Sequence, residues 1–222
     1  MIAKNLVSNE IIPLRTSDSG NEALSIMNEF GVRHLPIVNN KHLLGLISED
    51  DILNFDVEEA VGSYRLSTYR PYVRENDHLY EVIKVFSQQK LTLMPVVNVE
   101  EEYIGLIAQE DLIHYFAHIG SFTEPGSILV LEIARRDYSL VEIARIVESE
   151  GGTILSSFVT SSLENNSMLI DVTIKVNRPD LGSIIATFER FEYTIKATFS
   201  EEQFSNTIKE RYDLLMAYSN RY

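Results

Sequence analysis

The fold of this chain is decided by two apolar runs, a polar turn between them and a helix start, read as GVRHLPIVNNKHLLGLISEDDIL at residues 31–53. The arrangement returns about sixty residues later as KLTLMPVVNVEEEYIGLIAQEDLI at residues 90–113. Leu35-Pro36-Ile37-Val38 matches Met94-Pro95-Val96-Val97, and Gly45 matches Gly105. The offset is 59 residues for the first match and 60 for the second, and recurrence at a nearly constant spacing indicates an internal repeat. The first half of the chain is therefore predicted to be one structural unit built twice.

A helix is predicted ahead of the first copy. Ser19 with Glu22 three residues later forms a capping-box signature. Gly31 is placed to end the helix, because glycine readily adopts the left-handed conformation that follows a helix. The positions that recur at helical spacing, and are expected to face inward, are Ala23, Ile26, Met27 and Phe30.

Two strands and a second helix are predicted next. Ile37-Val38 and residues 43–47 are short apolar runs that suit buried strands, with Asn39-Asn40 turning between them. Ser48 and Asp51 form a second capping box. Each copy is therefore predicted to contain a helix, a strand, a turn, a second strand and a second helix, of mixed α/β class. One copy is too small to bury its own apolar face, whereas two packed together bury roughly 60–70% of the surface that their unfolded chain exposes.

The motif Gly31-x-x-x-Leu35-Pro36, followed after eleven residues by Ser48-x-x-Asp51, resembles the cystathionine-β-synthase (CBS) domain, which occurs as tandem pairs. The resemblance covers about residues 1–118 and implies β-α-β-β-α repeats at 1–60 and 61–120. It also implies an adenosine-type ligand in the cleft between the repeats, with ribose on Asp51 and phosphate on Ser48. The expected ligand-binding residues are Ile12, Pro13, Arg33, His34, Pro36, Ser48, Asp51, Leu93, Pro95 and Asp111.

The residues themselves leave two interpretations of the Ser48 motif open. A helix N-terminus attracts anions, and a carboxylate three residues on can accept hydrogen bonds from a sugar diol. A capping box, however, needs no ligand. The second copy has Lys90 in place of Gly31 and Ala108 in place of Ser48, but keeps Asp111. We therefore expect one good site around Ser48 and Asp51, and a degraded site around Asp111.

Local charge narrows the ligand expected at the first site. Glu49, Asp50 and Asp51 are consecutive acids, and like charges ~4 Å apart repel by about 4 kcal/mol at an effective dielectric of 20. A metal-free triphosphate would be repelled unless Mg²⁺, or Arg33 and His34, offset these charges. The expected ligands are therefore AMP, S-adenosylmethionine or ATP with Mg²⁺.

The last third changes pattern after FTEPG at residues 122–126. Strands are predicted over 127–133, 153–160, 168–176 and about 195–199, helices from Leu140 and from Pro179, and a polar hairpin loop over 161–167. The order βαββαβ is ferredoxin-like. The residues expected to face inward are Leu140, Ile143, Ala144, Val147, Ile170, Val172, Ile174, Val176, Leu181, Ile184, Ile185, Phe188, Phe191, Ile195, Ala197 and Phe199.

Residues 121–200 are predicted to be one domain, of which about residues 127–200 are similar to the ACT domain, a regulatory module that often binds amino acids at a dimer interface. That family usually has an Asp-x-x-Gly-x-Leu loop, whereas this chain has Asp137-Tyr138-Ser139-Leu140 without the glycine. Dimerisation is therefore favoured over amino-acid binding, and a homodimer is expected. The module order resembles that of the acetoin-utilisation regulatory proteins (AcuB). Residues 201–222 are predicted to form an amphipathic α-helix that covers either the chain's own core or a partner, through Phe204, Ile208, Tyr212 and Leu215.

Composition excludes several functions. Lys and Arg number 19 against 33 Asp and Glu, a net charge of −14, which disfavours nucleic acid and anionic membranes as partners. No apolar stretch is long enough to span a bilayer, and the chain has no Cys, which suits the reducing cytoplasm.

Common catalytic motifs are absent, and His114 and His118 lack an evident third metal ligand. We expect a cytoplasmic regulatory protein with an unknown partner and no obligatory cofactor; an interaction scaffold with empty clefts is the alternative.

Overall fold

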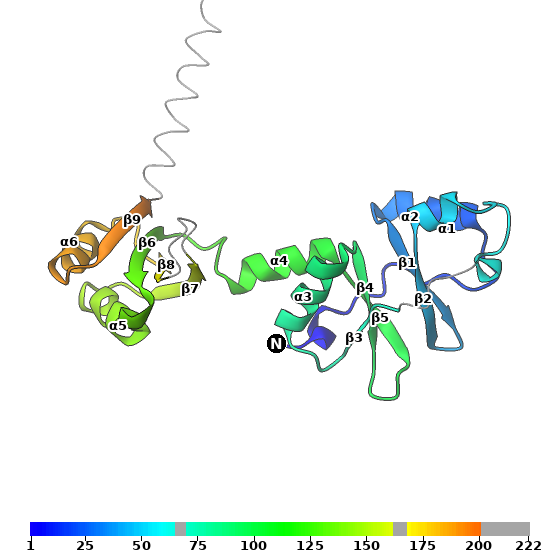
Figure 1. The fold of residues 1–222 in the computed structure, drawn as a ribbon, viewed down its shortest axis with the longest axis horizontal. Helices are drawn as coiled ribbons and strands as arrows, with labels where there is room; N and C mark the ends of the chain where they lie inside the picture. The colour runs from blue at the N-terminus through cyan, green and yellow to red at the C-terminus, as the bar shows by residue number, and fades with distance from the viewer. Residues whose placement is uncertain (65–69, 162–167, 201–222) are drawn as a thin grey trace, which may run out of the picture. The chain divides into compact units, whose positions relative to one another are not determined.

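The computed structural model describes residues 1–64, 70–161 and 168–200, and the chain divides into two compact units, Met1–Phe116 and Ala117–Tyr222. Figure 1 shows the elements of each unit. The mixture of helices and sheets confirms the predicted α/β and α+β class. In the described ranges no helix is both long enough and apolar enough to cross a lipid bilayer. The tail helix predicted over 201–222 lies outside the described residues.

The first repeat has the predicted helix-strand-strand-helix order, whereas the first strand of the expected β-α-β-β-α repeat is replaced by an isolated bridge between Leu14 and Ile37. Its elements are α1 (Gly20–Phe30), β1 (His34–Asn39), β2 (His42–Ser48), α2 (Glu49–Leu53) and the 3-10 turn η2 (Val61–Ser63). The Ser19 capping box is formed, and Gly31 ends α1 at a φ of 63°. Strands β1 and β2 pair antiparallel. The turn between them lies at Asn40 and Lys41, one residue later than predicted, where φ is 46° and 70°.

The second repeat has the same helix-strand-strand-helix order, preceded by a short strand. It contains the 2-residue strand β3 (Val73–Arg74), α3 (Leu79–Gln89), β4 (Leu93–Val97), β5 (Tyr103–Ala108) and α4 (Gln109–Ile119). The sheet order is β3-β4-β5. Lys90 takes the left-handed conformation after α3, at a φ of 53°, just as Gly31 does after α1. The two copies are also joined by a common core, in which Leu93 and Leu106 pack with side chains of the first repeat.

Each repeat is completed by the segment that precedes the other one. The 3-10 turn η1 (Ala3–Leu6) packs on the second repeat, where the Ala3 N–H donates to the Asp77 carbonyl at 2.8 Å. Val61 and Tyr64, which follow the first repeat, are buried in its core. The first residues of the chain thus belong structurally to the second repeat. This exchange brings residues 8–11 to the second repeat's strand β5, which the boundary predicted at residue 60 did not indicate.

The second unit has the ferredoxin-like sheet. Its elements are β6 (Ser127–Ala134), η3 (Arg135–Asp137), α5 (Leu140–Ser149), β7 (Ile154–Ser161), β8 (Leu169–Val176), α6 (Gly182–Arg190) and β9 (Thr194–Phe199). The antiparallel sheet has the order β7-β8-β6-β9, and both helices pack on its apolar face. The predicted inward residues of β8 are buried, which confirms the alternation read from the sequence.

Three details of that unit differ from the prediction. Helix α6 begins at Gly182 rather than Pro179, because the Asp180 side chain accepts the Gly182 N–H at 2.9 Å. Two residues predicted to face inward are exposed at helix ends: Leu140, the first residue of α5, is 46% exposed, and Phe191, just after α6, is 44% exposed. A register shift in the β6–β9 pairing puts Ala197 opposite Val130 and Ile195 opposite Leu131, and Phe199 is 59% exposed. Because side chains alternate along a strand, this one-residue bulge moves Ala197 and Phe199 off the face that Ile195 occupies.

Candidate functional site

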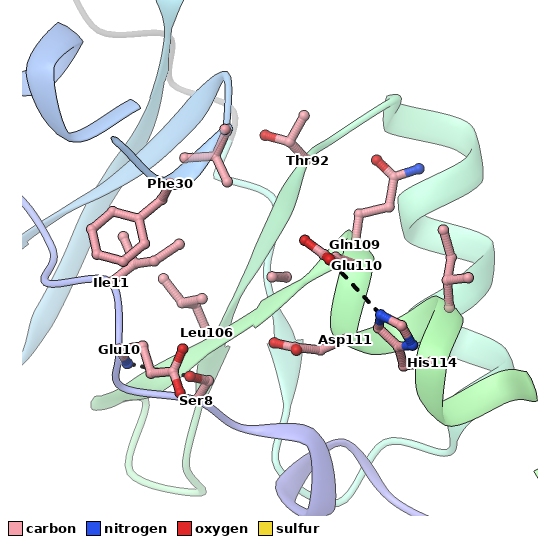
Figure 2. Close-up of a pocket in the computed structure, with 14 residues that line it drawn as sticks. Ser8, Glu10, Ile11, Phe30, Thr92, Leu106, Gln109, Glu110, Asp111 and His114 are labelled. Atoms are coloured by element: carbon pink, nitrogen blue, oxygen red, sulfur yellow. Dashed lines mark hydrogen bonds and ion pairs between the residues drawn. The ribbon is translucent and has the colours of Figure 1, made fainter. Parts of the chain in front are cut away.

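A cavity of about 350 Å³ lies in the first unit, between the N-terminal segment, the end of α1 and the start of α4. Ile11, Phe30 and Leu106 form its apolar wall, and Asp111 lies on α4 (Figure 2). Phe30 is 41% exposed at the rim, so its predicted inward position is wrong: it lies at the end of the helix beside the left-handed Gly31. The lining residues are Ser8, Glu10, Ile11, Phe30, Gly31, Val32, Thr92, Leu106, Ala108, Gln109, Glu110, Asp111, Ile113 and His114.

Backbone pairing holds the N-terminal segment in the cavity wall. The Ser8 N–H donates to the Leu106 carbonyl at 2.8 Å, and the Leu106 N–H donates back at 3.1 Å. Gly105 permits this approach. Its φ is +143°, and a Cβ there would lie 2.5 Å from Val7 Cγ1 and 2.9 Å from the Ser8 carbonyl oxygen. A side chain at residue 105 would therefore push residues 7–9 away from β5.

The two repeats position equivalent carboxylates differently. In the first repeat, Asp51 Oδ2 accepts from the Ser48 N–H at 2.9 Å and from Ser48 Oγ at 2.6 Å, and Ser48 Oγ accepts from the Asp51 N–H at 3.1 Å. In the second repeat Ala108 precedes the helix and has no hydroxyl. Asp111 accepts no hydrogen bond from any residue within 1–64, 70–161 and 168–200. The absence of the cap leaves the Asp111 carboxylate available in a cavity.

A second, polar depression of about 450 Å³ lies at the start of α2. Its described lining residues are Arg33, His34, Ser48, Glu49, Asp50, Gln89, Lys90 and Thr92, so none is aliphatic or aromatic apart from the His34 imidazole. Asp51 is not among them. The acidic group expected at the centre of the first site is instead held by its own capping box.

Thr92 lies on the border of both cavities and links the repeats. Its Oγ1 accepts the Arg33 N–H at 2.9 Å and lies 3.0 Å from His34 Nδ1, and its N–H donates to the same nitrogen at 3.3 Å. Burial lowers the pKa of His34, since a buried imidazolium loses hydration; the charge of Asp51 opposes this, and Arg33 adds to it. The neutral ring is thus the form that accepts from Thr92.

The structure separates the predicted site residues into three groups. Asp111 lines the first cavity, and Arg33, His34 and Ser48 line the polar depression. Pro36, Leu93 and Pro95 are buried and line neither cavity. Ile12 is 72% exposed, and neither it nor Pro13 lines either cavity, because Ile11 and Leu14 are the residues of that segment that turn inward.

Several lining residues were missed by the sequence reading. Ser8 and Glu10 come from a segment without a motif, and their place depends on pairing with β5. Thr92, Glu110 and His114 flank recognised motif positions, and the duplication could have indicated Thr92, because Arg33 is its counterpart. His114 Nε2 lies 3.8 Å from Glu110 Oε1. Over the described ranges, no three His, Asp or Glu side chains are grouped to hold a metal ion.

Two homologous halves that share a core and enclose a ligand-sized cavity define a tandem ligand-binding module. The CBS domain model matches residues 3–58 and 61–118, more than half of the chain, and the chain therefore belongs to the CBS domain family. CBS pairs are regulatory, ligand-sensing modules. The predicted tandem pair is confirmed.

The relatives described next each match about half of this chain. Over 117 residues, 52% of this chain, it is 26% identical to an inosine-5′-monophosphate dehydrogenase of Korarchaeum cryptofilum, of which it spans 24%. A CBS domain pair/ACT domain protein from Thermotoga maritima is 20% identical, with a TM-score of 0.48 over 53% of this chain and 98% of that one. The structure of CBSX2 in complex with AMP is 20% identical, with a TM-score of 0.47 over 53% and 97% of the two chains.

Proposed function

We propose that this chain is a cytoplasmic regulatory protein that senses an adenosine-type ligand in its CBS pair, with Asp111 holding the ribose. The observation that carries the proposal is the Asp111 carboxylate, which lines the 350 Å³ cavity and has no hydrogen-bond partner among the described residues. Vicinal hydroxyls of a ribose offer two donors to such a group, and charge-assisted hydrogen bonds are stronger than neutral ones.

The apolar wall opposite Asp111 is suited to contact with a purine base. Phe30, Ile11 and Leu106 present aromatic and aliphatic surface across the cavity from Asp111 (Figure 2). Aromatic rings stack favourably on one another, and apolar area removed from water adds to binding. Ligand pockets are typically about 300–1,000 Å³ in volume, so this cavity suits a nucleoside.

The polar depression at Ser48 is a weaker candidate for the same ligand. Arg33, Lys90 and the Ser48 hydroxyl would attract the phosphate of AMP or of ATP with Mg²⁺, but the described lining offers no aliphatic wall to a base. The capping box of Asp51 favours the alternative of an empty scaffold cleft at this position, because one of its carboxylate oxygens already accepts two hydrogen bonds.

The ferredoxin-like unit is proposed to be ACT-like and to serve for homodimerisation or signal output to an unknown regulated protein. A ligand shifts a conformational equilibrium only by its difference in affinity between two states, and couplings of about 1–3 kcal/mol are usual. No catalytic role is proposed, since the sequence lacks the common catalytic motifs.

The test compares two matched variants in calorimetric titrations of the full chain with adenosine, AMP, S-adenosylmethionine and Mg-ATP. Asp111→Ala should weaken the tightest of these by ~10- to 100-fold, the loss of a charged hydrogen-bond pair, and leave the urea midpoint nearly unchanged. Asp51→Ala should lower stability by about 1 kcal/mol through loss of the cap and change affinity little. Binding that is lost in Asp51→Ala but retained in Asp111→Ala would refute the assignment.

A further inference from the structure

The cavity around Asp111 is negatively charged. Glu10, Glu110 and Asp111 line it, and no Lys or Arg is among its described lining residues. Ala108 takes the place that Ser48 holds in the other repeat, so the strand end adjoining α4 offers no hydroxyl donor to a phosphate. An apolar wall with acids around it is suited to an organic group without negative charge.

The three acids are not equivalent. Glu110 has His114 beside it, 3.8 Å away, and Asp111 is the group proposed to hold the ribose. Glu10 is on the N-terminal segment, on the other side of the cavity from α4 (Figure 2). Its N–H donates to Ser8 Oγ at 3.2 Å, but its carboxylate has no ion pair in the described part of the chain. Glu10 is thus an uncompensated charge facing the remainder of the ligand.

We propose that this cavity selects adenosyl ligands whose 5′ substituent is uncharged or cationic, and that Glu10 is the residue that sets this specificity. The inference rests on the proposed function, because it presumes an adenosine-type ligand on Asp111. A 5′-phosphate would bring two negative charges toward Glu10 and Asp111, whereas a sulfonium or a neutral thioether would be attracted or tolerated.

The first repeat offers the contrasting environment within the same molecule. Its depression is lined by Arg33 and Lys90 as well as by Glu49 and Asp50, and the Ser48 hydroxyl is present. Among the described lining residues of the two cavities, Arg and Lys therefore line only the polar depression, and Thr92 is common to both cavities. The duplicated halves have diverged in charge, so the two positions need not take the same ligand.

The experiment is calorimetric titration of the full chain, without Mg²⁺, using adenosine, S-adenosylmethionine and AMP. The same titrations are repeated with Asp111→Ala, and the binding that this variant loses is assigned to the cavity. S-adenosylmethionine should bind there about tenfold or more tightly than AMP at low salt, with adenosine between them. Higher salt should narrow this ratio, because ions screen exposed charges.

Glu10→Gln keeps the size of the side chain and removes its charge. Since Glu10→Gln removes one of the two uncompensated carboxylates, it should reduce the tenfold ratio of S-adenosylmethionine affinity to AMP affinity to about threefold. Glu29→Gln is the matched control: Glu29 is exposed on α1 and does not line the cavity, so the ratio should stay nearly as it was.

The outcomes separate the two proposals. AMP binding through Asp111 as tightly as S-adenosylmethionine, or a ratio that Glu10→Gln leaves unchanged, would overturn the charge selection and leave the proposed function standing. If none of the three probes binds, the proposed function fails, and the charge selection fails with it.

Discussion

Replacing Ala108 by serine should stabilise the protein and weaken its binding of adenosine. The first repeat shows what the new hydroxyl would do: Ser48 Oγ accepts the Asp51 N–H at 3.1 Å, and Asp51 Oδ2 accepts from Ser48 N–H and Oγ at 2.9 and 2.6 Å. Ala108 occupies the matching position before α4, with Asp111 three residues on. Ala108→Ser should therefore form a second capping box at Asp111.

The substitution is expected to raise the free energy of unfolding and to lower the affinity for adenosine. Because Ser→Ala at a helix N-cap costs roughly 0.5–2 kcal/mol, the reverse change should raise the free energy of unfolding by about 1 kcal/mol. The serine would occupy one of the two oxygens that the ribose needs. A hydrogen bond to a charged group contributes about 1.5–3 kcal/mol, and partial competition for it should weaken adenosine binding by about three- to tenfold.

The stability change is measured by urea unfolding without ligand, and the affinity by calorimetric titration with adenosine. Ala117→Ser, in the last turns of α4, makes the same chemical change away from the N-terminus and should lower stability by about 0.5 kcal/mol through helix propensity. Adenosine binding that stays unchanged in a stabilised Ala108→Ser protein would show that Asp111 does not hold the ribose. Tighter binding would show that the hydroxyl itself meets the ligand.

Two other perturbations test the surroundings of the site. Gly105→Ala should destabilise the protein by about 2 kcal/mol or more, because its Cβ would lie 2.5 Å from Val7 Cγ1, and it should also weaken adenosine binding. Gly31→Ala, with nothing within 4 Å of the added Cβ, should cost only about 1 kcal/mol of stability. Equal losses of stability in the two variants would contradict the role given to Gly105. Burial lowers the pKa of His34 below 6.5 in the folded protein. The contribution of the neutral imidazole to the free energy of unfolding is therefore complete above pH ~6.5 and is lost as the pH falls from there to the lowered pKa. Urea unfolding at pH 7.5 and pH 5 should therefore show a larger acid loss for the wild type than for His34→Gln, by up to ~1.4 kcal/mol for each unit of the pKa shift; an equal loss would mean that His34 titrates normally.

Local features of the fold could be predicted because their causes lie within a few residues. The capping boxes at Ser19 and Ser48 and the helix end at Gly31 are formed by groups three or four positions apart. The duplication and the βαββαβ order could be read from spacing alone. Buried alternation along β8 likewise follows from the period of a strand.

The site required contacts between distant residues. Glu10 reaches the cavity because Ser8 pairs with Leu106, almost a hundred residues away, and no local pattern encodes that pairing. The β9 bulge is similar: Ile195, Ala197 and Phe199 alternate along the sequence, but the pairing with β6 inserts one residue and divides them between two faces.

Sequence by itself determined a duplicated unit with CBS motifs followed by a ferredoxin-like unit, since periodicity and capping are short-range properties and a repeat is found by matching two stretches of the same chain. Only the tertiary structure decided which carboxylate is available to a ligand. From the sequence alone, Ala108 indicates that the second repeat has lost the functional serine that the first repeat has at Ser48. In the folded protein, Ala108 leaves Asp111 without a cap, facing a cavity whose other wall comes from the N-terminal segment. The physical reason is that an acidic group binds a ligand only with the hydrogen-bonding capacity that its own fold leaves unused.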